Sequence, residues 1–189
     1  IMAWNIDGLS DKFSDDNFID ELSSHDICIL SETFLENNDI SPPPGYFYFN
    51  AFRSKKHKKA KRGAGGVLVL VKKSIQKYVS KIAVIKEHFI WIKISKDLTG
   101  HVNDTFCCCG YIPPQGTSFY KNNEIDLIEE LDKSIIHYSN LGHIFITGDY
   151  NSRTADSIDI HLHDEWDKNT NEICGESQQV FKRNSKDKT

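Results

Sequence analysis

The run VLVLV at positions 67–71 limits the possible folds of this chain more than any other segment. Side chains of a strand alternate between its two faces, and here both faces are apolar. Such a strand has to be covered above and below, which requires several layers. The segment FIWIKIS at 89–95 differs, because its isoleucines share one face and Lys93 lies on the other. We therefore expect this second strand nearer the edge of a sheet.

Strand-like and helix-like segments alternate along the chain. Further apolar runs typical of strands cover residues 2–6, 26–32, 46–52, 106–113 and 143–149. A first helix is predicted by the spacing of Phe18, Ile19 and Leu22, with Asp15 or Asp16 as its N-cap. A second is predicted within 119–140, with an apolar face formed by Ile125, Ile128, Leu131 and Ile135. The pattern predicts an α/β sandwich with more than one sheet.

Composition sets the remaining limits. The 189 residues are 39% hydrophobic, which suffices for the core of one domain. The net charge of −4 means that affinity for a polyanion would have to come from a local patch. Cys107, Cys108 and Cys109 alternate between strand faces, so they are expected to be reduced core thiols of an intracellular protein. No apolar run approaches the roughly 20 residues of a membrane span.

Polar residues follow several of the predicted strands at the point where each strand ends. These residues are Asn5, Asp7, Glu32, Tyr111, Asp149 and Asn151. Taken singly, Asp and Asn at such places are ordinary turn formers, and a Glu after a strand is usually solvated. Only the joint pattern suggests a site.

The chemistry of these residues suits hydrolysis of a phosphodiester. The carboxylates of Asp7 and Glu32 are hard oxygen ligands of the kind that magnesium prefers. Asp149 is placed to orient or deprotonate a water, and Tyr111 and Asn151 can donate hydrogen bonds to phosphate oxygens. The strand ends therefore predict a metal-assisted phosphodiesterase site.

Four motifs carry a resemblance to a known family. In order along the chain, they are WNIDGL, SET, GYIPP and GDYN, and this ordered set resembles the endonuclease/exonuclease/phosphatase superfamily. The similarity is closest to abasic-site repair endonucleases and to endonuclease domains of non-LTR retrotransposons. RGAGGVLVLV and GDYNSRT favour the retrotransposon group. The resemblance covers residues 2–155, and we expect 156–189 to be a polar loop or poorly packed tail.

The resemblance implies a four-layered α/β sandwich of two mixed sheets flanked by helices. It also implies magnesium-dependent hydrolysis, with manganese as an alternative ion and no small-molecule cofactor. Asp7 and Glu32 would hold the metal with Asn5 beside them, and Tyr111 would contact the scissile phosphate or the leaving group. Asp149 would activate the water, and Asn151 would position that water or the phosphate. The substrate would be duplex DNA, in the nucleus if the chain is of retrotransposon type.

One part of the family pattern is missing. The family places a further Asp and a Ser-Asp-His motif in its last segment, and no SDH occurs in this sequence. We therefore interpret residues 1–189 as an incomplete domain, truncated at its C-terminal end, and expect little nuclease activity from it. Two alternatives remain open: a catalytically dead remnant that binds nucleic acid weakly, and a phosphatase or phospholipase of the same fold.

Two further segments carry candidate binding residues. Residues 53–62 are strongly basic, and they could be a solvated loop or contact the DNA backbone. The residues expected to contact DNA are Lys55, Lys56, Lys58, Lys59, Lys61 and Arg62. His161 and His163 would share a face in a strand and could bind zinc. Without a third ligand at a recognisable spacing, a polar loop is the better interpretation of that segment.

Overall fold

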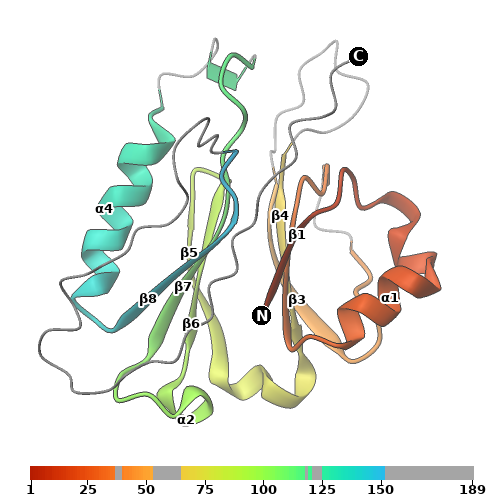
Figure 1. The fold of residues 1–189 in the computed structure, drawn as a ribbon, viewed down its shortest axis with the longest axis horizontal. Coiled ribbons are helices and arrows are strands. Elements are labelled where there is room, and N and C mark those ends of the chain that lie inside the picture. The colour runs from red at the N-terminus through yellow and green to blue at the C-terminus, as the bar shows by residue number, and fades with distance from the viewer. Residues whose placement is uncertain (37–39, 53–64, 118, 121–124, 152–189) are drawn as a thin grey trace, which may run out of the picture. The chain divides into compact units, whose positions relative to one another are not determined.

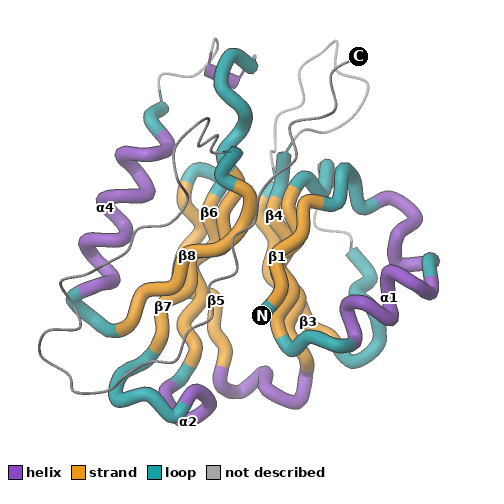
Figure 2. Tube along the Cα trace, viewed as in Figure 1, coloured by secondary structure: helices purple, strands orange, loops and turns teal. Residues whose placement is uncertain are grey.

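A computed structural model describes residues 1–36, 40–52, 65–117, 119–120 and 125–151. All of these lie within one compact unit, residues 1–152. Its strands form two four-stranded sheets, drawn in Figures 1 and 2. Among the described residues, no helix is long and apolar enough to cross a membrane.

The first sheet has the strand order β1-β2-β4-β3 and the second the order β5-β6-β7-β8. The strands of the first sheet are β1 (Met2–Asn5), β2 (Ile27–Ser31), β3 (Tyr46–Ala51) and β4 (Val67–Lys72). Those of the second are β5 (Val79–Ile85), β6 (Phe89–Ile94), β7 (Thr105–Tyr111) and β8 (His143–Asp149). The helical elements are η1 (Ser10–Ser14), α1 (Asp16–Ser23), η2 (Lys73–Tyr78), α2 (Lys96–Thr99) and α4 (Leu127–Ser139).

The core is divided into three apolar clusters, and β4 contributes to two of them. Val67, Val69 and Val71 pack between the sheets, against residues such as Ile92 of β6. On the other face of β4, Leu68 and Leu70 pack with residues of α1. The third cluster joins α4 to the outer face of the second sheet. The predicted four-layered α/β sandwich of two mixed sheets flanked by helices is therefore confirmed.

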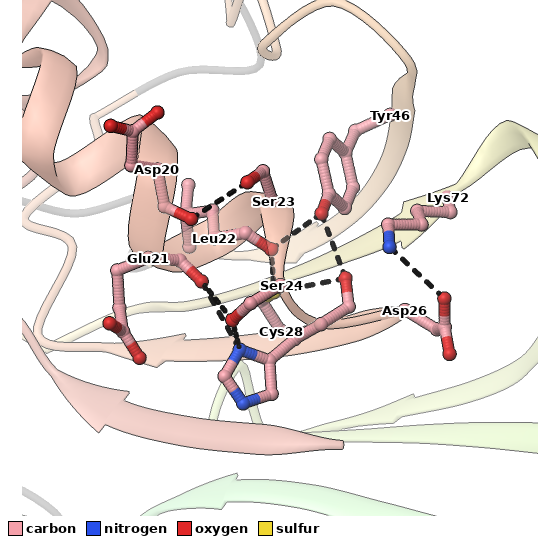
Figure 3. A network of polar contacts seen from close by, with 10 residues as sticks. Asp20, Glu21, Leu22, Ser23, Ser24, Asp26, Cys28, Tyr46 and Lys72 are labelled. Carbon is pink, nitrogen blue, oxygen red and sulfur yellow. Dashed lines mark hydrogen bonds and ion pairs between the residues drawn. The ribbon is translucent and has the colours of Figure 1, made fainter.

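Helix α1 is fixed at both ends by side chains. The Asp15 carboxylate accepts hydrogen bonds from the backbone N–H groups of Asn17 and Phe18, which confirms an N-cap predicted from the sequence. At the other end, the Tyr46 hydroxyl from β3 donates to the carbonyls of Leu22, at 2.6 Å, and His25, at 2.8 Å (Figure 3). The Leu22 carbonyl also accepts from the backbone N–H of His25, so the Tyr46 hydroxyl adds a second donor there and ties the end of α1 to the first sheet.

The second predicted helix forms as α4, but its buried face differs from the prediction. Asp126 caps it by accepting from the backbone N–H groups of Ile128 and Glu129. Leu127 and Leu131 are buried beneath it, whereas Ile128 is 54% exposed. Placing Ile128 on the apolar face was therefore wrong, because the capped first turn directs Leu127 toward the sheet instead.

Strand β6 lies no nearer the edge of its sheet than β4 does, because each is second from an edge, which corrects a second expectation. It lies between β5 and β7, and Phe89 and Trp91 of its outer face are buried against the third cluster. Lys93 does not indicate an edge strand, because it lies near the strand end and reaches out to Asp104, with 3.5 Å between Nζ and Oδ2. The edge strand β5 was missed, since a register shift between Lys81 and Ala83 breaks its alternation of apolar side chains.

The cysteine run behaves as predicted. Cys107 and Cys109 point into the cluster between the sheets, and Cys108 points to the opposite cluster under α4. All three are buried and free, as is Cys28. They are core residues of the described part of the chain.

Candidate active site at the strand ends

Parallel pairing at one edge of each sheet brings the polar strand ends together. β1 runs parallel to β2, with Asn5 opposite Ser31, and β7 runs parallel to β8, with Tyr111 opposite Asp149. A parallel pair needs a crossover connection, which α1 and α4 provide here. The C-terminal ends of both pairs lie at the same end of the sandwich, the upper end in Figure 2.

Two hydrogen bonds join these ends across the two sheets. The side-chain amide of Asn5 in β1 donates to Asp149 Oδ2 in β8, at 2.6 Å. The hydroxyl of Tyr111 in β7 donates to Glu32 Oε1, directly after β2, at 2.9 Å. Residues as far apart in the chain as 5 and 149 thus form one polar cluster.

The carboxylate of Asp149 is held through both of its oxygens. Its Oδ2 accepts from Asn5 and its Oδ1 accepts from the backbone N–H of Asn151, at 3.0 Å. Its own carbonyl accepts from the backbone N–H of Ile112, whose carbonyl accepts from the Asn151 side chain, at 2.8 Å. These bonds orient Asp149 and place Asn151 beside it.

Asp7 reaches the same end through the turn after β1. Its backbone N–H donates to Asn5 Oδ1, at 3.2 Å, and the next residue, Gly8, donates to the carbonyl of Glu32, at 2.7 Å. Asp7 is exposed and Glu32 is half-buried. All six residues predicted from the sequence are therefore brought to one end of the sandwich.

Three residues of this cluster have strained backbone conformations. The φ angles are 46° at Asp7, 55° at Glu32 and 48° at Asn151. They lie in the left-handed region, which residues other than glycine rarely adopt. Asp and Asn tolerate this region better than Glu does, so Glu32 is the most unusual of the three. Each such residue costs about 1–3 kcal/mol, and residues of this kind gather at functional sites.

Tyr111 is buried, and its ring lies against two neighbours. A Cβ added at Gly65, where φ is +68°, would lie 3.1 Å from Tyr111 Cε1, so the phenol ring packs on the glycine backbone. The His88 ring lies nearly parallel to it, at 12° with the ring centroids 6.4 Å apart. Sequence reasoning missed His88 because it considered only the ends of strands, and His88 precedes one. Since β6 is antiparallel to β7, however, the first residues of β6 lie beside the last residues of β7.

The cluster fits magnesium through the chemistry of its donors. Asp7, Glu32 and Asp149 offer carboxylate oxygens and Asn5 an amide oxygen, and magnesium takes one or two protein carboxylates together with water and phosphate oxygens. Within the described ranges, no group of three or more His, Cys, Asp or Glu is close enough to hold an ion by itself. An ion bound here would therefore need water and substrate oxygens beside the protein ligands.

Two predicted binding segments lie outside the described residues. These are the basic residues Lys55, Lys56, Lys58, Lys59, Lys61 and Arg62, and the pair His161 and His163. Their predicted roles stay predictions.

Comparison with known families decides the classification. The profile of the "Endonuclease/Exonuclease/phosphatase family" matches residues 2–170. The chain belongs to this family. Its members are hydrolytic phosphodiesterases and phosphatases that generally use divalent metal ions such as magnesium. A search of curated proteins gave no significant match.

Solved structures support the fold of this family member. The AP endonuclease LMAP from Leishmania major superposes with a TM-score of 0.59 at 16% identity, covering 82% of this chain and 55% of that one. The human Nocturnin catalytic domain with bound sulfate gives 0.53 at 11% identity, covering 81% and 64%. The 3' phosphatase NExo from Neisseria, bound to product DNA hairpin, gives 0.52 at 14% identity, covering 83% and 60%. The chain therefore spans less than two thirds of each of these structures.

Proposed function

We propose that this family member is a magnesium-dependent DNA endonuclease of retrotransposon type. The observation that carries the proposal is the pair of hydrogen bonds that join Asn5 to Asp149 and Glu32 to Tyr111 across the two sheets. These bonds gather carboxylates, amides and a phenol at one end of the fold, where each residue type matches a step of phosphodiester hydrolysis.

Asp149 acts on the attacking water. Its carboxylate is oriented by Asn5 and by the backbone N–H of Asn151, so one or both oxygens can accept a proton from a water at a fixed position. Manganese could replace magnesium as the ion, and no small-molecule cofactor takes part. Asn5 sets the direction of the Asp149 carboxylate and contributes its amide oxygen to the same cluster.

The phosphate group is bound by the hydroxyl of Tyr111 and by a metal ion held by Asp7 and Glu32. The Tyr111 hydroxyl, which donates to Glu32 in this structure, can donate instead to a phosphate oxygen or to the leaving group. Asp7 and Glu32 would hold the magnesium ion, which when bound supplies positive charge to the phosphoryl oxygens. Asn151 donates a side-chain N–H to the Ile112 carbonyl here, and its position beside Asp149 suits contact with the water or the phosphate.

Duplex DNA is the proposed substrate. In support, a structural neighbour, the NExo phosphatase of Neisseria, was solved with a product DNA hairpin. The basic residues between 53 and 62 would add salt-sensitive contacts to the DNA backbone. Retrotransposon type, which rests on the motifs RGAGGVLVLV and GDYNSRT, would place the protein in the nucleus.

A plasmid-nicking assay tests the proposal. We expect nicking of supercoiled DNA to require Mg²⁺ and to fall by about 10²–10⁴-fold in Asp149→Ala, the usual contribution of a general base. Asp132→Ala is the matched control, because Asp132 is an exposed carboxylate on α4. Equal nicking by Asp149→Ala and the control would overturn the assignment.

The same assay separates the remaining alternatives. Slow nicking is expected, because the Ser-Asp-His motif of the family does not occur among residues 1–189. A dead remnant would bind duplex DNA and nick it no faster with Mg²⁺ than without it. A phosphatase or phospholipase of the same fold would hydrolyse a small phosphate ester and leave the plasmid intact.

A further inference from the structure

His88 is a buried side chain at the candidate site that the proposed chemistry does not use. It is 6% exposed and directly precedes β6, at the end of the turn from β5. The last pair of the β6–β7 ladder is Phe89 with Gly110, so His88 faces Tyr111 one pair further on.

The His88 ring replaces a backbone donor of this ladder. The Tyr111 N–H donates to the His88 carbonyl, at 3.0 Å. In a regular antiparallel ladder the His88 N–H would return a bond to the Tyr111 carbonyl. Here that N–H instead closes the turn by donating to the Ile85 carbonyl, at 3.0 Å, and the imidazole Nδ1 lies 3.0 Å from the Tyr111 carbonyl oxygen. Because a carbonyl only accepts, Nδ1 carries the proton.

The turn that creates this arrangement is strained. Lys86 and Glu87 have φ angles of 51° and 59°, although turns with two such residues favour Asn and Gly. Non-glycine residues persist in this region only where the surrounding structure holds them there. In this turn the backbone N–H of His88 donates to the Ile85 carbonyl. The imidazole Nδ1–H of His88 therefore takes its place as donor to the Tyr111 carbonyl.

His88 also contacts the side chain of Tyr111, through its ring. His88 lies nearly parallel to the Tyr111 ring and edge-on to Phe119, with centroids 4.9 Å apart and an angle of 68°. The phenol is thus supported by His88 and packs on Gly65, and its hydroxyl lies 2.9 Å from Glu32.

We propose that His88 is a positioning residue, which fixes the Tyr111 backbone through its Nδ1–H and the Tyr111 ring through stacking. The inference rests on the proposed function, because it concerns the residue assigned to the phosphate. His88 itself touches neither water nor substrate in this account.

Two substitutions separate the two contacts. In His88→Asn the side-chain amide lies at the place of Nδ1, so the bond to the Tyr111 carbonyl is kept while the ring is lost. In His88→Phe the ring is kept and the donor is lost. We expect kcat for plasmid nicking to fall about 10–100-fold in His88→Phe, the scale of a misplaced catalytic group, with a smaller fall in His88→Asn. KM is expected to change little in either variant.

A double-mutant cycle excludes a general effect on folding. Tyr111→Phe removes the hydroxyl through which His88 is proposed to act, so adding His88→Phe to it should lower kcat no further. A further fall of the same size as in the wild-type background would overturn the proposal. Failure is also distinguishable from failure of the proposed function: unchanged kcat in His88→Phe overturns only the inference if Asp149→Ala still abolishes nicking.

A spectroscopic measurement tests the same proposal without activity. In protein with ¹³C-labelled tyrosine, the Tyr111 ring signal is identified by its loss in Tyr111→Phe. Glu32→Gln should shift this signal, because it changes the acceptor of the hydroxyl, and the shift should shrink in His88→Phe. His137→Phe, at an exposed position on α4, is the control and should leave the shift unchanged. An equal shift in His88→Phe and the control would contradict the positioning role.

Discussion

At the scale of single residues, the polar strand ends could be predicted from the sequence because each follows an apolar run. Their chain order and residue types sufficed to select Asn5, Asp149 and their partners. His88 and the strain at Glu32 could not be predicted in this way. His88 reaches the site only because β6 pairs antiparallel with β7, which the sequence does not reveal. The positive φ of Glu32 cannot be recognised from its residue type.

Tyr46 offers a residue-scale prediction about stability. Its hydroxyl donates to the carbonyls of Leu22 and His25, so Tyr46→Phe removes this donor from both, although the Leu22 carbonyl keeps the backbone N–H of His25. We expect the free energy of unfolding to fall by about 1–3 kcal/mol, measured by urea denaturation. Tyr78→Phe is the control, since within the described part of the chain its hydroxyl makes no hydrogen bond. Equal losses in the two variants would contradict this role of Tyr46.

At the scale of elements, strands with a regular apolar pattern could be predicted, including the edge strands β1, β3 and β8, whereas the bulged edge strand β5 could not. β4 was recognised from its apolar faces, and it lies inside its sheet as expected. β5 was missed because its bulge interrupts the alternation on which the prediction relies. β6 was misplaced because one Lys near a strand end reaches solvent without the strand lying at an edge.

The parallel contact of β7 with β8 yields an element-scale prediction. Gly148, with φ of +134°, lies so close to the backbone of Gly110 that an added Cβ would collide with its carbonyl oxygen. Gly148→Ala should therefore push β8 from β7 directly before Asp149, and lower both stability and nicking. Gly100→Ala, where φ is +74° and no atom lies within 4 Å of the added Cβ, carries backbone strain without the collision. We expect Gly148→Ala to have a lower urea midpoint and a lower nicking rate than Gly100→Ala. Equal values in the two variants would contradict a collision between β7 and β8.

At the scale of the whole molecule, a sandwich with more than one sheet could be predicted because a strand apolar on both faces has to be covered twice, whereas the count of four layers came from the family resemblance. The face-to-face packing of the two sheets, with their polar strand ends on the same side, could only be inferred through resemblance to a family. Hydrogen bonds such as Asn5 to Asp149, 144 residues apart, arise from packing of the complete sandwich rather than from any local pattern.

Burial of thiols in this core predicts a loss of stability at alkaline pH. Burial raises the pKa of Cys28 from 9.0 to about 11 and that of Cys108 from 9.0 to about 12. Above pH 9 the unfolded chain therefore releases protons that the folded chain keeps. The contribution to stability is complete below pH 9 and is lost as pH rises toward these values, by up to about 1.4 kcal/mol per pH unit for each thiol. Urea denaturation between pH 8 and pH 10 should show this slope, and Cys28→Ala with Cys108→Ala should flatten it. If the free energy of unfolding of the double variant falls with pH as steeply as that of the wild-type protein, groups other than these two thiols cause the loss of stability.

The most direct test of the central claim, that the ends of the two sheets form one metal-dependent site, is the effect of Mg²⁺ on thermal unfolding. An ion that binds only the folded chain stabilises it by RT ln(1 + [L]/Kd), about 2.7 kcal/mol at 100 times Kd. We predict that Mg²⁺ raises the melting temperature of the wild-type protein and of Asp132→Ala, and that the rise disappears in Glu32→Gln. A rise of equal size in Glu32→Gln, or no rise in the wild-type protein, would contradict the account.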